Sequence, residues 1–300
     1  MDLSRLTDLC TRYHAAKQAG SPGLPQFSVL RRETESDIEA TVYEPVMCLI
    51  LQGAKVTSIG DQTVELTPGD TLLVSHDLPV TSRITKASPD EPYLAAILSL
   101  DLGLLRSLYD QLADAPVSGA PLRSLSAGPV EPAWLPALSR YVEMMDDPRD
   151  AKVLGPATLR EIHYRLLLSP LGAMLRSLLL ADSHASRIAK AIQHLRGGFR
   201  APLSVPDLAR IAGMSPSSFH EHFKAVTGTT PLQYQKDLRL IDARALLVDH
   251  RHSVSQAAYE VGYESPTHFS RDYSRKFGVP PSQHLRSTGP AGSGTEELHA

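Results

Sequence analysis

The C-terminal third of the chain contains one pattern twice, first in SVPDLARIAGMSPSSFHEHFKAVTGTTPLQ (204–233) and again in SVSQAAYEVGYESPTHFSRDYSRKFGVPPSQ (253–283). Four residues of the first copy recur 49 positions later, and after one additional residue six more recur 50 positions later. The matched pairs are Ser204/Ser253, Val205/Val254, Ala209/Ala258, Gly213/Gly262, Ser215/Ser265, Pro216/Pro266, Phe219/Phe269, Gly228/Gly278, Pro231/Pro281 and Gln233/Gln283. Solenoids need about three copies to bury a continuous core, so a pattern present twice requires another explanation.

Each copy predicts two helices joined by a tight turn. In the first copy Ser204 is a typical N-cap, and Gly213 can end the helix because glycine adopts the left-handed conformation at little cost. Ser215 then caps a second helix, and Pro216 takes its first position, where a missing N–H is harmless. Segments 204–228 and 253–278 are therefore predicted to be helix-turn-helix motifs, in which the second helix enters the major groove of DNA.

The segment between the two motifs predicts one long helix. Residues 231–248 place apolar side chains near helical spacing, and after Pro231 no glycine or proline interrupts them. A helix of this length is ~27 Å long. Such a rod can hold two recognition helices roughly one turn of DNA apart, ~34 Å, so that one chain covers two successive grooves.

This region resembles the DNA-binding domain of AraC/XylS-type bacterial transcription regulators. The strings that carry the resemblance are Ala-Leu-Leu (245–247), Val-Gly-Tyr-Glu-Ser (261–265), His-Phe-Ser-Arg (268–271) and Lys-Phe-Gly-Val-Pro-Pro (276–281). The resemblance implies a sequence-specific regulator, usually an activator, that binds double-stranded promoter DNA and contacts RNA polymerase. It also implies an N-terminal domain that senses a ligand or mediates dimerisation. The two cysteines, Cys10 and Cys48, offer no disulfide framework and no signal peptide is recognisable, so a cytoplasmic protein is expected.

The N-terminal half predicts mainly β-structure over about 27–101, after a helix over 3–19. Turn signals at 60–61 and 68–70 separate short runs of β-forming residues, which favours a small barrel or a double-sheet jelly roll. Residues 42–100 resemble the cupin-type sensor domain of the same family, and a small-molecule effector inside the barrel is expected. Helices are expected over about 102–180, at 102–112, 134–145 and 156–168, with a loop at 116–129. In the family such helices commonly form a homodimer interface, here within 132–180.

Charge supports a division into two domains. Residues 1–182 carry a net charge of −7 and residues 183–288 carry +6, within an overall −3. A basic module joined to an acidic one is typical of a DNA-binding protein with a separate sensor. We therefore expect an α+β chain with a cupin-like β-barrel domain (1–182) and an all-α DNA-binding domain (183–288) whose first helix spans 186–195. The Gly/Pro/Ser-rich tail, 289–300, is expected to be disordered.

Exposed residues early in each recognition helix are the candidates for base contacts, and basic residues further along are candidates for phosphate contacts. Arg271 is the leading candidate, because arginine can pair with guanine through two hydrogen bonds. The complete predicted DNA-binding set is Ser217, Ser218, His220, Glu221, Lys224, Thr267, His268, Ser270, Arg271, Arg275 and Lys276. The repeated aromatic residues are assigned to the core.

Other kinds of site receive little support. The β region offers only His76, without the closely spaced histidines of metal-binding cupins, so neither a metal nor another cofactor is expected. No nucleophile motif, phosphate loop, signal peptide or membrane span is recognisable, which argues against an enzyme and against a membrane protein.

Two alternative functions remain open. One is a regulator that senses oxidants or electrophiles through Cys48, although free cysteine is usually a small buried hydrophobe. The other is an architectural DNA-binding protein, which the acidic half disfavours.

Overall fold

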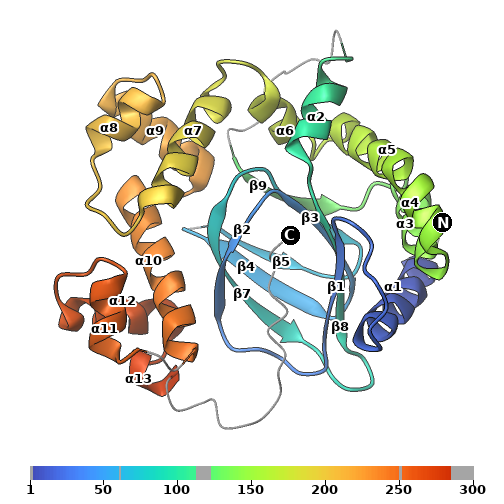
Figure 1. Ribbon diagram of the computed structural model, residues 1–300, viewed down its shortest axis with the longest axis horizontal. Helices are drawn as coiled ribbons and strands as arrows, with labels where there is room; N and C mark the ends of the chain where they lie inside the picture. The colour runs from blue at the N-terminus through green and yellow to red at the C-terminus, as the bar shows by residue number, and fades with distance from the viewer. Residues whose placement is uncertain (1–2, 61, 113–122, 250–251, 285–300) are drawn as a thin grey trace.

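The computed structural model describes residues 3–60, 62–112, 123–249 and 252–284. A two-sheet β-structure occupies the middle of the molecule, with helices of the N-terminal half on one side and the C-terminal helices on the other (Figure 1). The expected disordered tail lies outside the described residues. Within the described part of the chain, no helix is both long and apolar enough to cross a membrane.

The two sheets are antiparallel throughout. The larger has the order β1-β8-β3-β6-β9 and the smaller the order β2-β7-β4-β5. Their strands are β1 Phe27–Arg32, β2 Glu39–Tyr43, β3 Val46–Gln52, β4 Ala54–Ile59, β5 Gln62–Leu66, β6 Asp70–Val74, β7 Leu78–Lys86, β8 Tyr93–Ser99 and β9 Leu125–Pro129. The arrangement confirms the double-sheet prediction. The expected loop over 116–129 was wrong in part, because β9 pairs along β6 from Asp70↔Pro129 to Val74↔Leu125.

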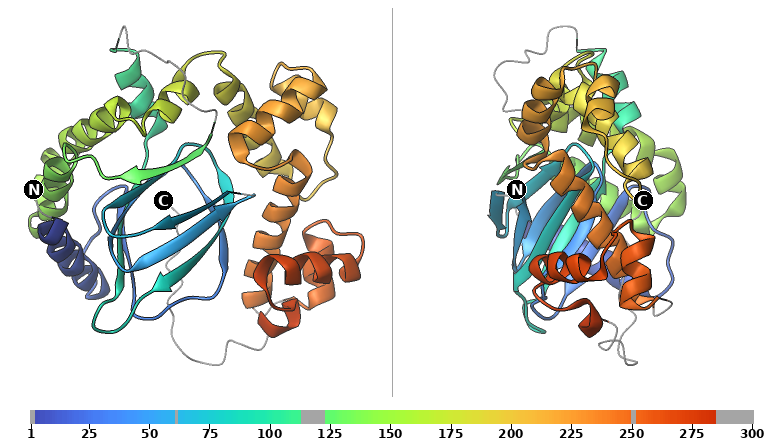
Figure 2. Two further views of the ribbon diagram at one scale, coloured as in Figure 1. Left: turned by 180° about the vertical axis from the view of Figure 1, so that it is seen from behind. Right: turned by 90° about the vertical axis from the view of Figure 1, so that its left-hand side faces the viewer.

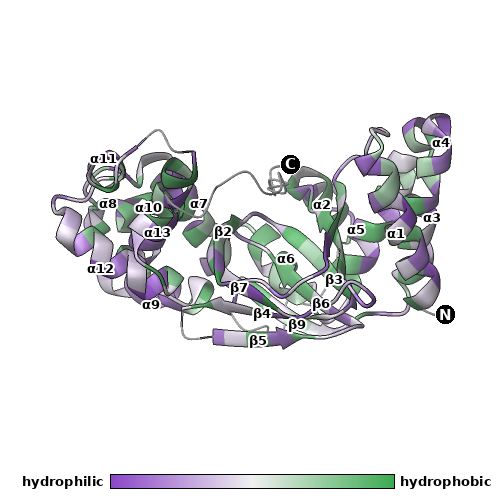
Figure 3. Cartoon of the chain, turned by 90° about the horizontal axis from the view of Figure 1, so that it is seen from below, coloured by the Kyte–Doolittle hydropathy of each residue, from purple (hydrophilic) through white to green (hydrophobic). Residues whose placement is uncertain are grey.

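Side-chain alternation on β3 explains why the larger sheet has two buried faces. Met47, Leu49 and Leu51 pack against the N-terminal helices. Cys48 and Ile50, on the opposite face, belong to the core between the sheets. Figure 3 shows this central strand in hydrophobic colours while β5, at the edge of the smaller sheet, carries hydrophilic residues. A run without alternating polarity is expected for a strand that is covered on both sides.

The helices of the N-terminal half cover one face of the larger sheet. They are α1 Leu3–Gln18, α2 Leu102–Tyr109, α3 Leu135–Glu143, α4 Pro148–Val153, α5 Gly155–Leu168 and α6 Ala173–Leu179, with a short 3₁₀ helix at Met144–Asp146. The sequence predicted α1, α2, α3 and α5 but not α4 or α6. On α5, the apolar stripe that includes Leu159 and Ile162 faces its own domain, as does His163. The His163 imidazole is fully buried and accepts a hydrogen bond from the Asp101 backbone N–H at 3.1 Å.

The C-terminal helices follow the predicted order. They are α7 His184–Gly198, α8 Val205–Ile211, α9 Pro216–Thr227, α10 Pro231–Val248, α11 Val254–Glu260, α12 Pro266–Phe277 and α13 Pro281–His284. The linker helix α10 has the bounds predicted for it. Helix α7 begins before the predicted 186 because the Ser183 hydroxyl caps it by accepting from the Ser186 N–H.

Candidate nucleic-acid interface and effector pocket

Helices α8 and α9 lie at one end of α10, and α11 and α12 lie at the other (Figure 1). Both second helices start with a serine N-cap and a proline at the first position, and both end at a glycine with positive φ, Gly228 and Gly278. Phe219 and Phe269 are completely buried at equivalent positions. Each buried phenylalanine fixes the rotation of its helix about the helix axis. The polar side chains next to it in the sequence therefore face outward.

The predicted contact residues largely occupy that outward face. Seven are exposed and reach solvent from the two helices, and Arg275 is exposed one turn further along α12. The exposed residues are Ser217, His220, Glu221, Lys224, Thr267, His268, Arg271 and Arg275. Ser218 and Ser270 are half-buried, and the Ser270 hydroxyl donates to the Pro266 carbonyl at 2.8 Å.

Lys276 is placed differently from the other predicted basic contacts. Its Nζ lies 2.9 Å from Oδ1 of Asp237 on α10, and both side chains are only 12% exposed. The structure thus gives Lys276 a role in attaching α12 to α10. Arg275 pairs with Asp272 at 2.6 Å but is itself 65% exposed.

A cavity of about 410 Å³ lies between α10 and the second helix-turn-helix unit, and Arg271 lines it together with Lys236, His268 and Asp272. The Arg271 guanidinium has no ion-pair partner among the described residues. Arg239, which also lines this cavity, instead donates to the Gly262 carbonyl at 2.9 Å and to the Phe199 carbonyl at 2.8 Å. Arg239 therefore joins α7 to the second turn, whereas Arg271 remains available.

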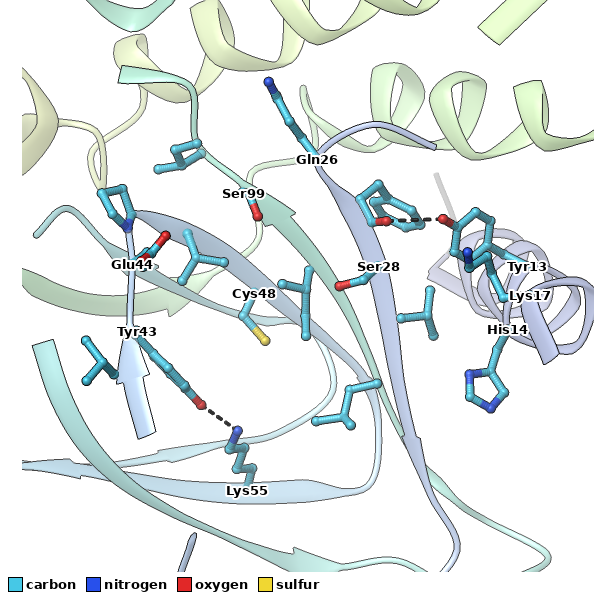
Figure 4. Close-up of a pocket in the computed structure, with 18 residues that line it drawn as sticks. Tyr13, His14, Lys17, Gln26, Ser28, Tyr43, Glu44, Cys48, Lys55 and Ser99 are labelled. Atoms are coloured by element: carbon cyan, nitrogen blue, oxygen red, sulfur yellow. Dashed lines mark hydrogen bonds between the residues drawn. The ribbon is translucent and has the colours of Figure 1, made fainter. Parts of the chain in front are cut away.

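A second cavity, of about 530 Å³, opens between the sheets beside α1 (Figure 4). Apolar side chains from β1, β2, β3 and β8 make up most of its wall. The lining residues at its floor include Tyr43, Cys48 and Lys55, and His14 and Lys17 of α1 lie on another side. The cavity lies within the β region where the effector was expected.

Lys55 is a buried cation in this cavity. Its side chain points inward from β4 and its Nζ donates to the Tyr43 hydroxyl at 2.7 Å (Figure 4). Cys48 lies nearby and burial raises the pKa of its thiol, an effect that Lys55 only partly opposes. A raised pKa leaves less of the reactive thiolate, so the environment of Cys48 does not favour the oxidant-sensing alternative.

The C-terminal helices pack directly against the β-structure. Arg196 of α7 contacts two carboxylates of the β region, Asp77 at 2.6 Å and Glu44 at 3.1 Å. The Tyr234 hydroxyl of α10 donates to the Asp77 carbonyl at 2.5 Å. Helix α10 lies along β2 and β7, as both views in Figure 2 show. The core of the first helix-turn-helix unit is continuous with the core between the sheets.

His76 belongs to this contact. It lies in the loop between β6 and β7 and is buried. Its Nε2 lies 3.1 Å from the Ala185 carbonyl of α7, and its Nδ1 lies 2.9 Å from the hydroxyls of Ser75 and Ser124. Burial lowers the pKa of His76 to about 4, although its bond to Ala185 acts in the opposite direction.

No cluster of three or more His, Cys, Asp and Glu side chains suited to a metal ion occurs in the described ranges. Sequence reasoning had singled out neither Lys55 nor Arg196. The sequence leaves two possible directions for the Lys55 side chain, one for each face of its strand. The alternation of residues along a strand does not say which of the two faces is buried. Arg196 had no local signal at all, since both of its partners are distant in the sequence.

Comparison with known families identifies the chain. The family described as AraC-type transcriptional regulator N-terminus matches residues 23–174, and a helix-turn-helix domain family matches residues 208–287. The chain belongs to the AraC family of transcription regulators. Sequence-specific binding of DNA by helix-turn-helix units is the activity of this family.

Relatives of this AraC-family regulator include named activators. The virulence regulon transcriptional activator VirF of Yersinia enterocolitica is 27% identical over 243 residues, which cover 78% of this chain and 86% of VirF. The regulator ExsA of Pseudomonas aeruginosa is 26% identical over 242 residues, covering 78% of this chain and 84% of ExsA.

Among solved structures, ToxT from Vibrio cholerae with a bound unsaturated fatty acid shares the fold of this AraC-family regulator. The TM-score is 0.55 at 14% identity, and the match covers 87% of this chain and 95% of ToxT. At this identity the similarity establishes the two-part fold.

Proposed function

We propose that this protein is a ligand-responsive transcription activator. It would bind promoter DNA by placing α9 and α12 in successive major grooves. Residues 183–288 would form the DNA-binding domain, and residues 1–182 the sensing and dimerisation domain. The observation that carries the proposal is the repeated geometry of the two units. Each is capped and anchored in the same way and presents polar side chains outward, and α10 holds the two apart.

Arg271 is the proposed base contact and Arg275 the proposed phosphate contact. Arg271 is exposed early in α12 without a carboxylate partner among the described residues, which leaves its guanidinium free for a guanine edge. Arg275 lies a turn further on, where a positive charge can contact the DNA backbone. Lys276 is not retained as a proposed contact, because Asp237 already neutralises its partly buried ammonium.

A small organic effector is proposed to occupy the 530 Å³ cavity between the sheets. Its volume lies within the range of about 300–1,000 Å³ typical of ligand pockets. ToxT, which shares the fold, is described with a fatty acid bound. The contacts of Arg196 and Tyr234 with the loop at Asp77 would connect the occupied domain to the DNA-binding helices.

A homodimer through the helices of 132–180 is also proposed. Val153 and Leu154, at the junction of α4 and α5, are 72% and 49% exposed, and Tyr164 and Leu168 are exposed on α5. These exposed apolar side chains are the candidates for the surface of association. Contact with RNA polymerase is proposed from the activator relatives.

The experiment that tests the DNA-binding proposal is selection of bound sequences from a random pool by the full-length protein, followed by salt titrations on the best site. Two short motifs about one helical turn apart are expected. Binding without any enriched motif would contradict the proposal and favour an architectural protein.

The matched variants Arg271→Ala and Arg275→Ala separate the two proposed roles. Arg271→Ala should weaken specific binding by ~1–3 kcal/mol and relax the preference at one base pair. Arg275→Ala should weaken binding to all sequences similarly and reduce the salt dependence by roughly one phosphate contact. Identical effects of the two substitutions would remove Arg271 from the base-reading set.

A further inference from the structure

We propose that the effector of the cavity between the sheets is a monoanion with an apolar body, and that its anionic group binds at Lys55 and Tyr43. This inference rests on the proposed function, since it assigns a chemical class to the effector proposed there. It depends on the polar groups that the fold buries around Lys55.

The ammonium of Lys55 is poorly compensated for a buried charge. The residue is 7% exposed, and an ammonium group has three hydrogen-bond donors. Its hydrogen-bond partner is the neutral hydroxyl of Tyr43, and no carboxylate lies within 4.0 Å in the described part of the chain. Burying an unpaired charge is costly unless another group of opposite charge compensates it.

Lys55 nevertheless remains a cation. Burial lowers the pKa of Lys55, but Tyr43, Cys48 and, with the smallest effect, Glu39 act in the opposite direction, and the net shift of the pKa is upward. An ammonium that keeps its proton in a cavity is suited to hold an oxyanion, because hydrogen bonds between charged groups are among the strongest in proteins.

Two buried hydroxyls near this cation also lack partners. The Tyr93 hydroxyl on β8 has no hydrogen bond to any described residue. Burial raises its pKa most, and Cys48 and Tyr43 lie close enough to raise it further. Thr57 is two residues beyond Lys55 on the same face of β4, and its hydroxyl is likewise unsatisfied. Buried polar groups normally have partners, so the region around Lys55 is unusually polar for a core. Neither Tyr93 nor Thr57 lines the cavity, so Lys55 and Tyr43 are the groups that a ligand there would contact.

Apolar side chains form another part of the cavity wall, beside polar residues such as Ser28 and Ser99, and this part can hold an apolar body. Val29, Val42, Val46, Ile97 and Leu100 line it. Contact with these side chains contributes hydrophobic free energy and no specificity for charge. A molecule with a charged group at one end and a hydrocarbon or aromatic remainder therefore fits both parts of the cavity.

The position of the anion site also connects it to the DNA-binding helices. Tyr43, whose hydroxyl accepts from Lys55 at the proposed site, is followed by Glu44, and the Glu44 carboxylate pairs with Arg196 of α7 at 3.1 Å. A ligand that moves the Tyr43 hydroxyl would thus act one residue from the contact between the two halves of the protein.

The test measures binding to the full-length protein by calorimetry with two matched pairs, decanoate against 1-decanol and 4-phenylbutyrate against 4-phenylbutanol. Each pair differs only in the charged group. The variant Lys55→Met removes the cation with a side chain of similar length that packs readily. The control Lys17→Met makes the same change at the exposed lysine that lines the cavity from α1.

The wild type should bind at least one acid more tightly than its alcohol. Lys55→Met should lower the affinity for that acid at least ~10-fold, the loss typical of a hydrogen bond to a charged group, and leave the alcohol unaffected. Lys17→Met should change neither. Failure of both acids to bind at millimolar concentration, equal affinity for acid and alcohol, or a loss caused by Lys17→Met would each overturn the inference.

DNA binding is measured on the same samples, which keeps this inference separate from the proposed function. Both variants should bind the selected DNA site without ligand as the wild type does, because neither lysine lies in the helix-turn-helix units. Loss of specific DNA binding in the unliganded wild type would count against the proposed function, whereas the comparison of acid with alcohol would still decide the class of ligand.

Discussion

Acidification should weaken the attachment of α7 to the β-structure through His76. The imidazole is 5% exposed, and its Nδ1 and Nε2 both have hydrogen-bond partners when it is neutral. The pKa of His76 is lowered from 6.5 to about 4 in the folded protein, chiefly by burial. As pH falls, the unfolded chain therefore takes up this proton first, and protonation favours unfolding.

The magnitude follows from the two pKa values. A tenfold difference in proton affinity corresponds to ~1.36 kcal/mol, so His76 can change the free energy of unfolding by about 3 kcal/mol in total. The stabilisation is complete above an unfolded-state pKa of about 6.5 and is lost progressively down to the folded-state pKa of about 4. Between about pH 7 and about pH 5 the loss from this group should be about 2 kcal/mol.

Urea unfolding of the wild type and of His76→Gln at these two pH values measures the effect. Glutamine cannot be protonated in this range, and its amide can still donate toward the Ala185 carbonyl. The pKa of His163 is also lowered by burial, and because both proteins retain His163 its contribution cancels in the comparison. The wild type should lose about 2 kcal/mol more than the variant on acidification. Equal losses in the two proteins would refute the assignment of His76 as a buried neutral group.

Two further predictions concern the core and the contact between the halves. Phe269→Ala should lower the free energy of unfolding by ~3–5 kcal/mol, measured with urea, because the ring is fully buried against Tyr263 and Tyr273. Gly60→Ala should be more destabilising in thermal unfolding than Gly213→Ala. Both glycines have positive φ, which costs a non-glycine residue ~1–2 kcal/mol, but only a Cβ at Gly60 would meet a backbone oxygen, that of Gly228 at 2.2 Å. Equal losses of thermal stability in the two glycine variants would mean that Gly60 is not in close contact with the Gly228 carbonyl at the end of α9.

Local signals were sufficient for the C-terminal helices. Serine caps, prolines at first helical positions and glycines with positive φ act within a few residues of themselves, and the structure places Ser204, Ser215, Ser253 and Ser265 at N-caps as predicted. Helix α4 also has local signals, an Asp147 cap followed by Pro148, but it is not among the helices predicted from the sequence.

Other features could not be found locally. Strand β9 has a weak sequence pattern, LSAGP, and exists because it completes the edge of the larger sheet beside β6. The sequence could not reveal that Lys276 pairs with Asp237 and is therefore unavailable to DNA. Their pairing depends on how α12 packs on α10. Pairing between distant segments depends on the packing of the whole chain, which no short window contains.

The amino-acid sequence by itself determined that this chain has two helix-turn-helix units, a linker helix between them and a β-rich N-terminal half. Those features follow from caps, turns and periodicity, which are properties of neighbouring residues. Only the tertiary structure decided that Lys55 faces a cavity, that His76 is buried against α7 and that Arg196 joins the two halves. Burial and charge pairing arise when segments far apart in the chain meet, so they are properties of the assembled fold.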